Sequence, residues 1–306
     1  MAIDPVEIVR CPTELRAEAV ALVLCELAPS LRRDVVGGLL DTENIEKSDA
    51  DALFVARRDL EIRGAAWGQR QSGNIVVFWP PQLAAGEDVT TAHRLAEAVT
   101  AAIDETDAEM MQVFLPAPAA ETVKVLQHVG FRHLADLRYM TAESARFPLA
   151  TPDGELEYGP YHGSQRSRLM DLVGRTYVGT LDCRDLDGVR DLDHVIKGYE
   201  ATGTYRPENW LFVRNEGEDV GVLLLADHPK GRHWELMYIA LVPEARGRGW
   251  GRQITRYAQW LARGAGIDRI VVAVDAANLP AVAMYRDSGF ELWDQRAVYV
   301  RVPERR

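Results

Sequence analysis

The chain has 306 residues, enough for two domains of about 150 residues each, and its 47% hydrophobic and 26% charged residues are ordinary for globular proteins. A net charge of −11, from 35 basic and 46 acidic residues, excludes a general nucleic-acid binder. No apolar run approaches the roughly 18 residues that cross a bilayer, and the three scattered cysteines form neither a disulfide framework nor a metal motif, so we expect a cytoplasmic protein.

The sequence repeats itself at a long interval. Leu-Phe-Val at residues 53–55 recurs at 211–213, 158 residues later, and Gly-Phe at 130–131 recurs at 289–290, 159 residues later. A period of this length indicates a duplicated domain rather than a solenoid.

The two halves contain the same predicted elements. In the first half, β-branched and aromatic runs at residues 76–78 and 111–115 predict strands. Segment 147–154 contains prolines, a glycine and an aspartate that suit a linker, so we expect domains over residues 1–148 and 153–306. In the second half the same reasoning predicts strands over 209–214, 219–226, 233–242, 268–274 and 290–301, and helices over 249–263 and 278–287.

A turn rich in glycine and arginine separates a predicted strand from a predicted helix. Residues 246–252 read Arg-Gly-Arg-Gly-Trp-Gly-Arg. Glycines let the backbone approach a ligand closely, N–H groups at a helix start bind anions, and the arginines add positive charge. The pattern predicts a diphosphate cradle, and the alternative is a turn that needs glycine, with solvated arginines. Neither GxxxxGK[ST] nor GxGxxG fits, because Arg252 stands where the second pattern needs its last glycine.

This turn resembles the acyl-CoA pyrophosphate loop of the GCN5-related N-acetyltransferases, the GNAT superfamily. Residues 278–285, Asn-Leu-Pro-Ala-Val-Ala-Met-Tyr, and Ser-Gly-Phe at 288–290 are similar to the next block of that family. The likeness covers residues 205–300 well and the first half in outline. It implies a mixed α/β (α+β) fold of two tandem GNAT-like domains, each a mostly antiparallel mixed sheet flanked by helices. It also implies acetyl-CoA as acyl donor and no metal.

The resemblance further implies a set of donor-binding residues. Backbone groups at the end of the strand would pair with the pantetheine arm, and backbone N–H groups of the turn would hold the pyrophosphate. An asparagine at the start of the next helix would touch the pantetheine, although asparagine there also suits a helix N-cap. These positions are Leu241 and Val242, then Arg246, Gly247, Arg248, Gly249, Trp250, Gly251 and Arg252, and finally Asn278.

Two residues are candidates for proton transfer. The resemblance implies that Tyr285 protonates the departing thiolate, since a phenol is an acid that keeps its proton at neutral pH. Half-buried packing is the alternative for this tyrosine. An amine acceptor must also lose a proton, which requires a base. Glu235 is an acid on an otherwise apolar strand, at a position where some family members carry a general base; a solvent-facing residue is the alternative.

A run of acids lies around Cys183 and His194. It favours a cationic, amine-bearing acceptor by electrostatic attraction, and the alternative is a solvated face with one aspartate as a helix N-cap. The cysteine and histidine match neither a thiol–base pair nor a metal motif. The acids are Asp182, Asp185, Asp187, the predicted cap, Asp191 and Asp193.

The first half lacks the residues that would bind acyl-CoA. At an offset of 159, the turn falls on residues 87–92, which begin with two acids and contain no glycine. At the same offset, Ala119 stands in the place of Asn278, and Leu126 stands in the place of Tyr285. Carboxylates would repel a diphosphate and leucine cannot donate a proton, so we expect a degenerate, non-catalytic first domain.

The sequence therefore predicts an N-acetyltransferase that moves the acetyl group of acetyl-CoA to the primary amine of a small molecule by direct attack. Two alternatives stay open. One is a protein lysine or N-terminal acetyltransferase, which would need an extended acceptor groove. The other is a non-catalytic acyl-CoA sensor, in which Tyr285→Phe would be silent.

Overall fold

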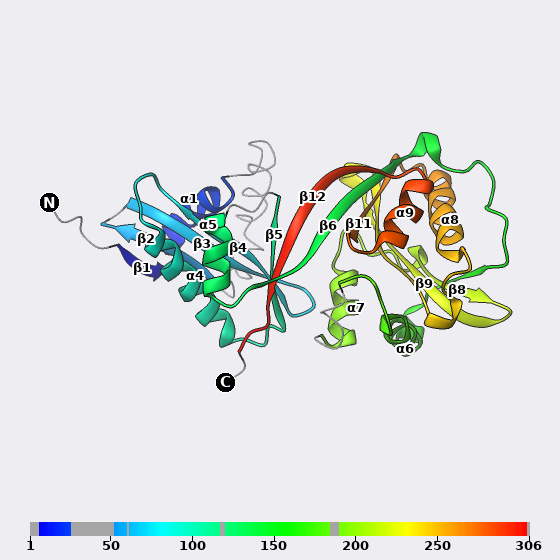
Figure 1. Ribbon diagram of the computed structural model, residues 1–306, viewed down its shortest axis with the longest axis horizontal. Helices are drawn as coiled ribbons and strands as arrows, with labels where there is room; N and C mark the ends of the chain where they lie inside the picture. The colour runs from blue at the N-terminus through cyan, green and yellow to red at the C-terminus, as the bar shows by residue number, and fades with distance from the viewer. Residues whose placement is uncertain (1–5, 26–51, 60, 117–119, 184–189, 305–306) are drawn as a thin grey trace. The chain divides into compact units, whose positions relative to one another are not determined.

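The computed structural model describes residues 6–25, 52–59, 61–116, 120–183 and 190–304. The chain forms two compact units (Figure 1). The first contains Met1–His133 and Val298–Arg306, and the second contains Leu134–Ala297.

The first unit is a mixed sheet with helices on both faces. Its described elements are β1 (Glu7–Arg10), α1 (Arg16–Val23), β2 (Ala52–Arg58), β3 (Glu61–Gln71), β4 (Ile75–Leu83), α4 (Val89–Asp104), β5 (Met110–Leu115) and α5 (Ala120–His128). The strand order is β1-β2-β3-β4-β5, with the end of β12 (Glu291–Arg301) next to β5. Neighbours are antiparallel from β1 to β4, and β4 is parallel to β5.

Small residues of β3 let a helix approach the sheet of the first unit closely. A Cβ atom added at Gly64 would lie 3.1 Å from a methyl group of Leu95, and one added at Gly68 would lie 3.0 Å from Val99. Leu95 and Val99 are both buried residues of α4, and this helix begins after the N-cap Asp88. The apolar stripe of α4 therefore forms the core on this face, as its 3.6-residue spacing requires.

The second unit repeats this architecture. Its elements are β6 (Arg132–Glu143), β7 (Glu157–Pro160), α6 (Arg166–Tyr177), α7 (Leu192–Glu200), β8 (Trp210–Asn215), β9 (Glu218–His228), β10 (His233–Leu241), α8 (Trp250–Gly264), β11 (Arg269–Asp275), α9 (Leu279–Asp287) and β12. The strand order is β12-β6-β11-β10-β9-β8-β7. The pair β10–β11 is parallel, and the pairs from β10 to β7 and β6–β11 are antiparallel. The predicted class, mixed sheets flanked by helices, is confirmed.

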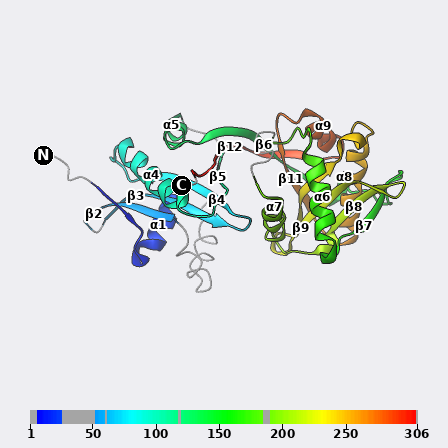
Figure 2. The same ribbon diagram turned by 90° about the horizontal axis from the view of Figure 1, so that it is seen from below.

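Helices cover both faces of the second sheet. α6 and α7 lie on one face, and α8 and α9 lie on the other (Figures 1 and 2). Tyr238 of β10 marks the first face, because its hydroxyl is 2.7 Å from the hydroxyl of Thr176 on α6 and its ring stacks on Tyr199 of α7. On the other face, Thr255 of α8 donates to the sulfur of Met284 on α9.

β10 and β11 separate along their length. They pair over four positions, from His233 with Arg269 to Leu236 with Val272, whereas β10 continues to Leu241 and β11 to Asp275. A β-bulge at Met237 accompanies the separation. β10 therefore has a backbone edge beyond the bulge that β11 does not occupy.

The compact units do not coincide with the two halves of the repeat. β6 lies before the predicted linker in sequence, yet it pairs with β11 from Glu143 to Leu137 in the second unit. The chain end returns to the first unit, where the guanidinium of Arg301 donates to both carboxylate oxygens of Asp104, at 2.6 and 2.7 Å. Each unit thus contains a strand segment from the other half of the sequence.

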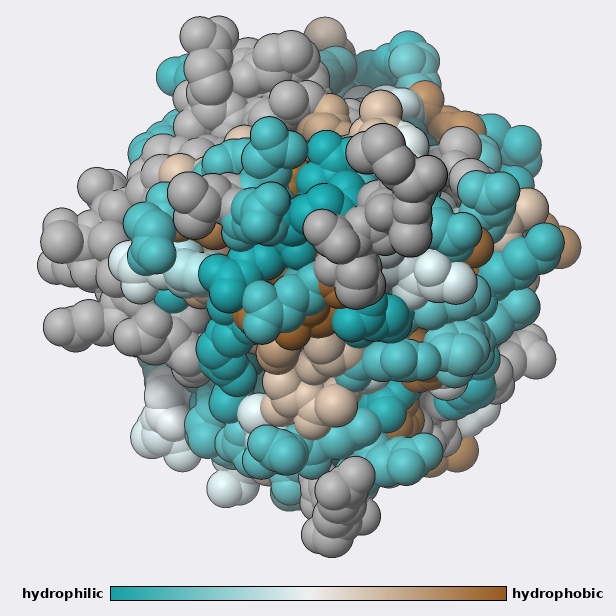
Figure 3. Space-filling view, turned by 90° about the vertical axis from the view of Figure 1, so that its left-hand side faces the viewer, coloured by the Kyte–Doolittle hydropathy of each residue, from teal (hydrophilic) through white to brown (hydrophobic). Residues whose placement is uncertain are grey.

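The surface of the first unit is mainly hydrophilic, as the share of charged residues in the sequence leads us to expect. Val89 and Val302 are the large hydrophobic side chains exposed among the described residues of the first unit, and the face in Figure 3 is mainly hydrophilic, with a hydrophobic area near its middle. Within the described part of the chain, no helix has both the length and the apolar character needed to cross a bilayer.

Candidate active site

The glycine-rich turn opens α8 as the sequence predicts. Gly247 and Gly249 adopt φ angles of +77° and +78°, a conformation that side chains disfavour, and Gly249 is the N-cap of α8. A Cβ atom added at Gly247, Gly249 or Gly251 would meet nothing within 4 Å. Among the described residues, no acceptor bonds to the backbone N–H groups of residues 247–251, whereas the N–H of Arg246 already donates to the Pro243 carbonyl. Five N–H groups at the positive end of a helix are therefore free of described acceptors.

The side chain of Arg246 is committed to the protein backbone. Its guanidinium donates to the carbonyl oxygens of Thr176 at 2.7 Å, Val178 at 2.8 Å and Gly179 at 2.9 Å, and to that of Leu241 at 3.1 Å. It therefore fixes the segment after α6 to the end of β10, instead of the phosphate contact expected from the sequence. No sequence motif indicates this role, because all the acceptors are backbone carbonyls.

Arg246→Lys is expected to destabilise the protein by about 1–3 kcal/mol, since an ammonium cannot reach four carbonyls arranged around a planar guanidinium. Arg248→Lys is the matched control. Arg248 is exposed, makes one hydrogen bond at 3.3 Å to the Glu244 carbonyl and stacks over Trp250, so its loss is expected to stay below about 0.5 kcal/mol. Thermal unfolding of the two variants measures the difference, and equal shifts would contradict the assigned role.

Two cationic side chains besides that of Arg246 lie at the turn. Arg252 is exposed in the first turn of α8, and no hydrogen bond or ion pair joins its guanidinium to a described residue. Arg248 lies within the turn itself. Leu241, which is half-buried, and Val242, which is buried, lie at the end of β10. They are next to the backbone edge that β11 leaves free.

α9 holds the two other predicted residues of this region. Asn278 is its N-cap, with its side-chain oxygen accepting from Ala281 N–H at 3.3 Å, so the structural role expected for asparagine is present. Tyr285 is 3% exposed and packs edge-on against Phe290, with ring centroids 5.4 Å apart. Burial raises the pKa of Tyr285 above its ordinary value, and the nearby charge of Asp182 raises it further. The phenol therefore keeps its proton at neutral pH.

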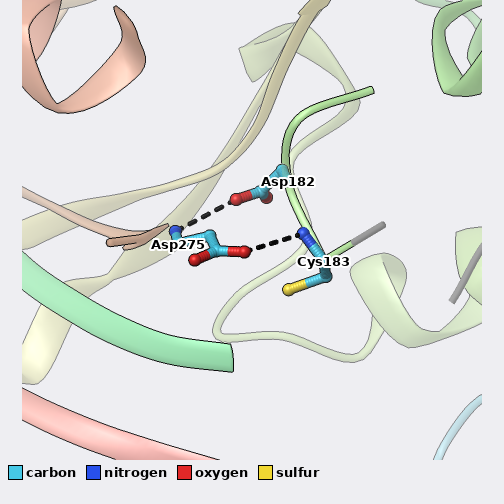
Figure 4. Close-up of side chains that lie close together, drawn as sticks. All are labelled: Asp182, Cys183 and Asp275. Atoms are coloured by element: carbon cyan, nitrogen blue, oxygen red, sulfur yellow. Dashed lines mark hydrogen bonds between the residues drawn. The ribbon is translucent and has the colours of Figure 1, made fainter. Parts of the chain in front are cut away.

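Asp182, Cys183 and Asp275 join the segment after α6 to the end of β11 (Figure 4). Asp275 N–H donates to Asp182 Oδ1 at 3.0 Å, and Cys183 N–H donates to Asp275 Oδ2 at 3.3 Å. Ala277 N–H occupies the other oxygen of Asp275, at 2.8 Å. Carboxylate and thiol atoms of these residues lie within 4.8 Å of one another. Burial, followed by the two carboxylates, raises the pKa of the Cys183 thiol to about 12, so the free thiol keeps its proton at neutral pH.

Glu235 lies on the face of the sheet covered by α6 and α7. Its Oε2 is 3.1 Å from Nε2 of His228, and 37% of its side chain is exposed. It stands opposite Val271 of β11, one position before the last pair of the two strands. Tyr139 of β6 shares this face; burial raises the pKa of its phenol most, and the charge of Glu235 raises it further. Ala273 in the middle of β11 is exposed, so the sheet is uncovered there.

The described acids of residues 182–193 have different structural roles. Asp191 is the N-cap of α7, accepting from Asp193 N–H at 2.7 Å. Asp193 pairs with Lys197 and Arg166, which lower the pKa of its carboxyl. Asp185 and Asp187, the expected cap, lie outside the described residues, as does Ala119. Among the described acids of this group, Asp182 is the one whose charge raises the pKa of Tyr285.

The corresponding turn of the first unit is shorter and acidic. The connection from β4 to α4 consists of residues 84–88. It is three residues shorter than the connection from β10 to α8, which consists of residues 242–249. Asp88 caps α4 by accepting from Thr90 N–H at 2.8 Å, where Gly249 caps α8. The carboxylate of Glu87, on a side chain that is 6% exposed, pairs with Arg63 and Arg58, and both arginines lower its pKa.

Comparison with known sequences supports the likeness of the second unit to one family. Residues 168–290 match the Acetyltransferase (GNAT) family. Mycothiol acetyltransferase of Thermobifida fusca (strain YX) is 38% identical over 98 residues, 32% of this chain and 28% of that protein, so the match spans less than a third of this relative. Mycothiol acetyltransferase of Saccharomonospora viridis is 23% identical over 266 residues, 82% of this chain and 81% of that protein.

Solved structures share the fold over the whole chain. A GCN5-related N-acetyltransferase from Sphaerobacter thermophilus has a TM-score of 0.65 at 14% identity and covers 99% of this chain and 98% of its own. A tandem GNAT protein from the clavulanic acid biosynthesis pathway has a TM-score of 0.52 at 13% identity and covers 98% and 99%. The chain therefore has a tandem GNAT fold, and its residues 168–290 match the Acetyltransferase (GNAT) family.

Proposed function

We propose that the second unit transfers the acetyl group of acetyl-CoA to the primary amine of a small molecule. The observation that carries this proposal is the turn over residues 247–251, with five N–H groups free of described acceptors, open space beside its glycines and the positive end of α8 behind it. Arg248 and Arg252 add charge for the diphosphate, and the free edge of β10 at Leu241 and Val242 lies next to it for the pantetheine. Asn278, the N-cap of α9, contacts the pantetheine in this proposal.

Glu235 and Tyr285 supply the proton transfers in this proposal. Glu235 accepts a proton from the ammonium of the acceptor, and the freed nitrogen lone pair forms a bond to the thioester carbonyl carbon. The carbon–sulfur bond then breaks as Tyr285 donates its phenolic proton to the departing sulfur, and the second proton that the nitrogen loses on becoming an amide restores the phenol through solvent. The raised pKa of Tyr285 keeps that proton available, and the exposed part of Glu235 lets an amine reach its carboxylate.

The acceptor is proposed to be a cationic small amine. The charge of Asp182 acts on Tyr285, and Glu235 adds a carboxylate on the sheet, so negative charge near these two proposed reacting groups would favour an ammonium. Several relatives are named mycothiol acetyltransferases, so mycothiol without its acetyl group is the first acceptor to test.

The first unit is proposed to be non-catalytic. Asp88 and Glu87 place carboxylates at the start of α4, Leu126 stands where the repeat offset places the tyrosine, and Arg58 and Arg63 both pair with Glu87. A diphosphate would meet negative charge there. One acetyl-CoA per chain is therefore the expected stoichiometry.

Ligand binding followed by an amine screen tests the proposed function. Acetyl-CoA or CoA at about 100 times its Kd is expected to add roughly 2.7 kcal/mol to the free energy of unfolding, whereas ATP and NAD add little. Calorimetry is expected to give one site per chain. Release of CoA is then followed with unacetylated mycothiol, cysteamine, glucosamine and a lysine peptide. Absence of any shift with acetyl-CoA would remove the donor assignment, and release with the peptide alone would replace the small amine by a protein acceptor.

A further inference from the structure

A histidine lies directly behind the proposed base. His228 ends β9 and Glu235 lies on β10, with Nε2 and Oε2 3.1 Å apart. The register pairs His228 with His233 and Ala226 with Glu235, so the imidazole and the carboxylate project from the same face of the sheet. An ionised carboxylate can only accept, so Nε2 of His228 carries the hydrogen and donates to Oε2. The second oxygen of Glu235 then stays available to an amine.

The structure holds the ring of His228 in place from two sides. Its ring lies nearly parallel to that of His233, with centroids 4.6 Å apart and 4° between the planes. A Cβ atom added at Gly203 would lie 3.0 Å from Cε1 and 3.1 Å from Nε2 of His228, so the turn at Gly203 closes its edge. Burial lowers the pKa of His233, which keeps that ring neutral, so the stack does not set two positive charges against each other. The donor is therefore rigid before any acceptor arrives.

We propose that His228 is a positioning residue for acetyl transfer, which orients the Glu235 carboxylate by donating a hydrogen bond to one of its oxygens. This inference rests on the proposed function. In the proposed step the N–H bond of the acceptor ammonium breaks, and its proton forms a bond to the free oxygen of Glu235. His228 keeps its own hydrogen throughout. Without that hydrogen bond the half-exposed carboxylate samples other rotamers and meets the amine less often.

Two replacements of His228 separate hydrogen bonding from packing. His228→Gln keeps an N–H donor at similar reach but loses the ring stack, and His228→Phe keeps a ring against His233 but has no donor. With acetyl-CoA and the panel amine that releases CoA fastest, kcat is expected to fall about tenfold or more for His228→Phe and to stay within about threefold for His228→Gln. The KM for acetyl-CoA is expected to stay unchanged in both. The opposite order of the two variants would show that the ring only packs.

A double-mutant cycle tests whether His228 acts through Glu235. Glu235→Gln alone is expected to lower kcat strongly, and His228→Phe in that background is expected to add less than about twofold. Equal effects of His228→Phe in both backgrounds would overturn the positioning role while leaving the proposed function intact. An unchanged kcat for Glu235→Gln would remove the base itself, and no CoA release by the wild type with any amine would remove the proposed function. Thermal unfolding of each variant confirms that it is folded.

Discussion

Gly249→Glu is expected to abolish acetyl-CoA binding, with Kd raised at least about 100-fold. Gly249 has a φ of +78° at the N-cap of α8, and its Cβ would point into open space within the turn whose N–H groups, at residues 247–251, lack described acceptors. A glutamate there would place a side chain and a negative charge where the diphosphate is proposed to lie. Titration calorimetry with acetyl-CoA measures the change.

Gly266→Glu provides a matched control for the backbone strain. Gly266 follows the other end of α8 with a φ of +71°, and a Cβ atom there would also meet nothing within 4 Å. Both substitutions force a side chain into the left-handed region, at a cost of about 1–2 kcal/mol each. Only Gly249→Glu is expected to lose acetyl-CoA. Equal affinity losses would mean that the strain, and not the turn, controls binding; retained affinity in both would end the assignment of the turn.

Tyr285→Phe is expected to lower kcat by about 100-fold and to leave acetyl-CoA affinity nearly unchanged. The phenol is the proposed acid for the departing thiolate, and general acids typically contribute factors of this size. Because burial and Asp182 raise its pKa, Tyr285 stays protonated throughout the neutral range, and the expected loss is the same from pH 6 to 8. Steady-state kinetics at several pH values measure it.

The packing of Tyr285 gives this variant a clear control. Phenylalanine keeps the ring that contacts Phe290, so the thermal midpoint is expected to change little. Tyr161→Phe removes a hydroxyl from another buried tyrosine, which packs on Trp210 and Phe212, and is expected to keep full activity. An unchanged rate for Tyr285→Phe would favour the packing role that the sequence also allows.

Local patterns predicted the second half well. The predicted helix over residues 249–263 is observed as Trp250–Gly264, and the predicted strand over 233–242 as His233–Leu241. These elements carry strong periodicity, and glycines mark the ends of the helix. The helices α6 and α7 were not among the predicted elements.

Long-range contacts explain what the sequence did not predict. The acceptors of Arg246 include carbonyls about 70 residues earlier, and backbone carbonyls carry no residue signature. His228 reaches Glu235 only because the hairpin between β9 and β10 sets their register. A constant offset of 159 also places Glu87 opposite Arg246, whereas the shorter connection makes Asp88 the residue at the cap of α4. A constant offset therefore pairs the wrong residues wherever one copy of the repeat is shorter than the other.

The exchanged strands give the first half of the sequence a role that does not require it to bind any ligand. β11 carries Asp275 at its end and separates from β10 beside the proposed donor site, and its other edge is held by β6 over residues 137–143. β6 is encoded before the linker. A gene shortened to residues 153–306 would therefore leave β11 with an open edge, prone to pairing with other chains. Loss of the first half of the sequence would therefore also remove the strand that pairs with this edge of β11 in the second unit.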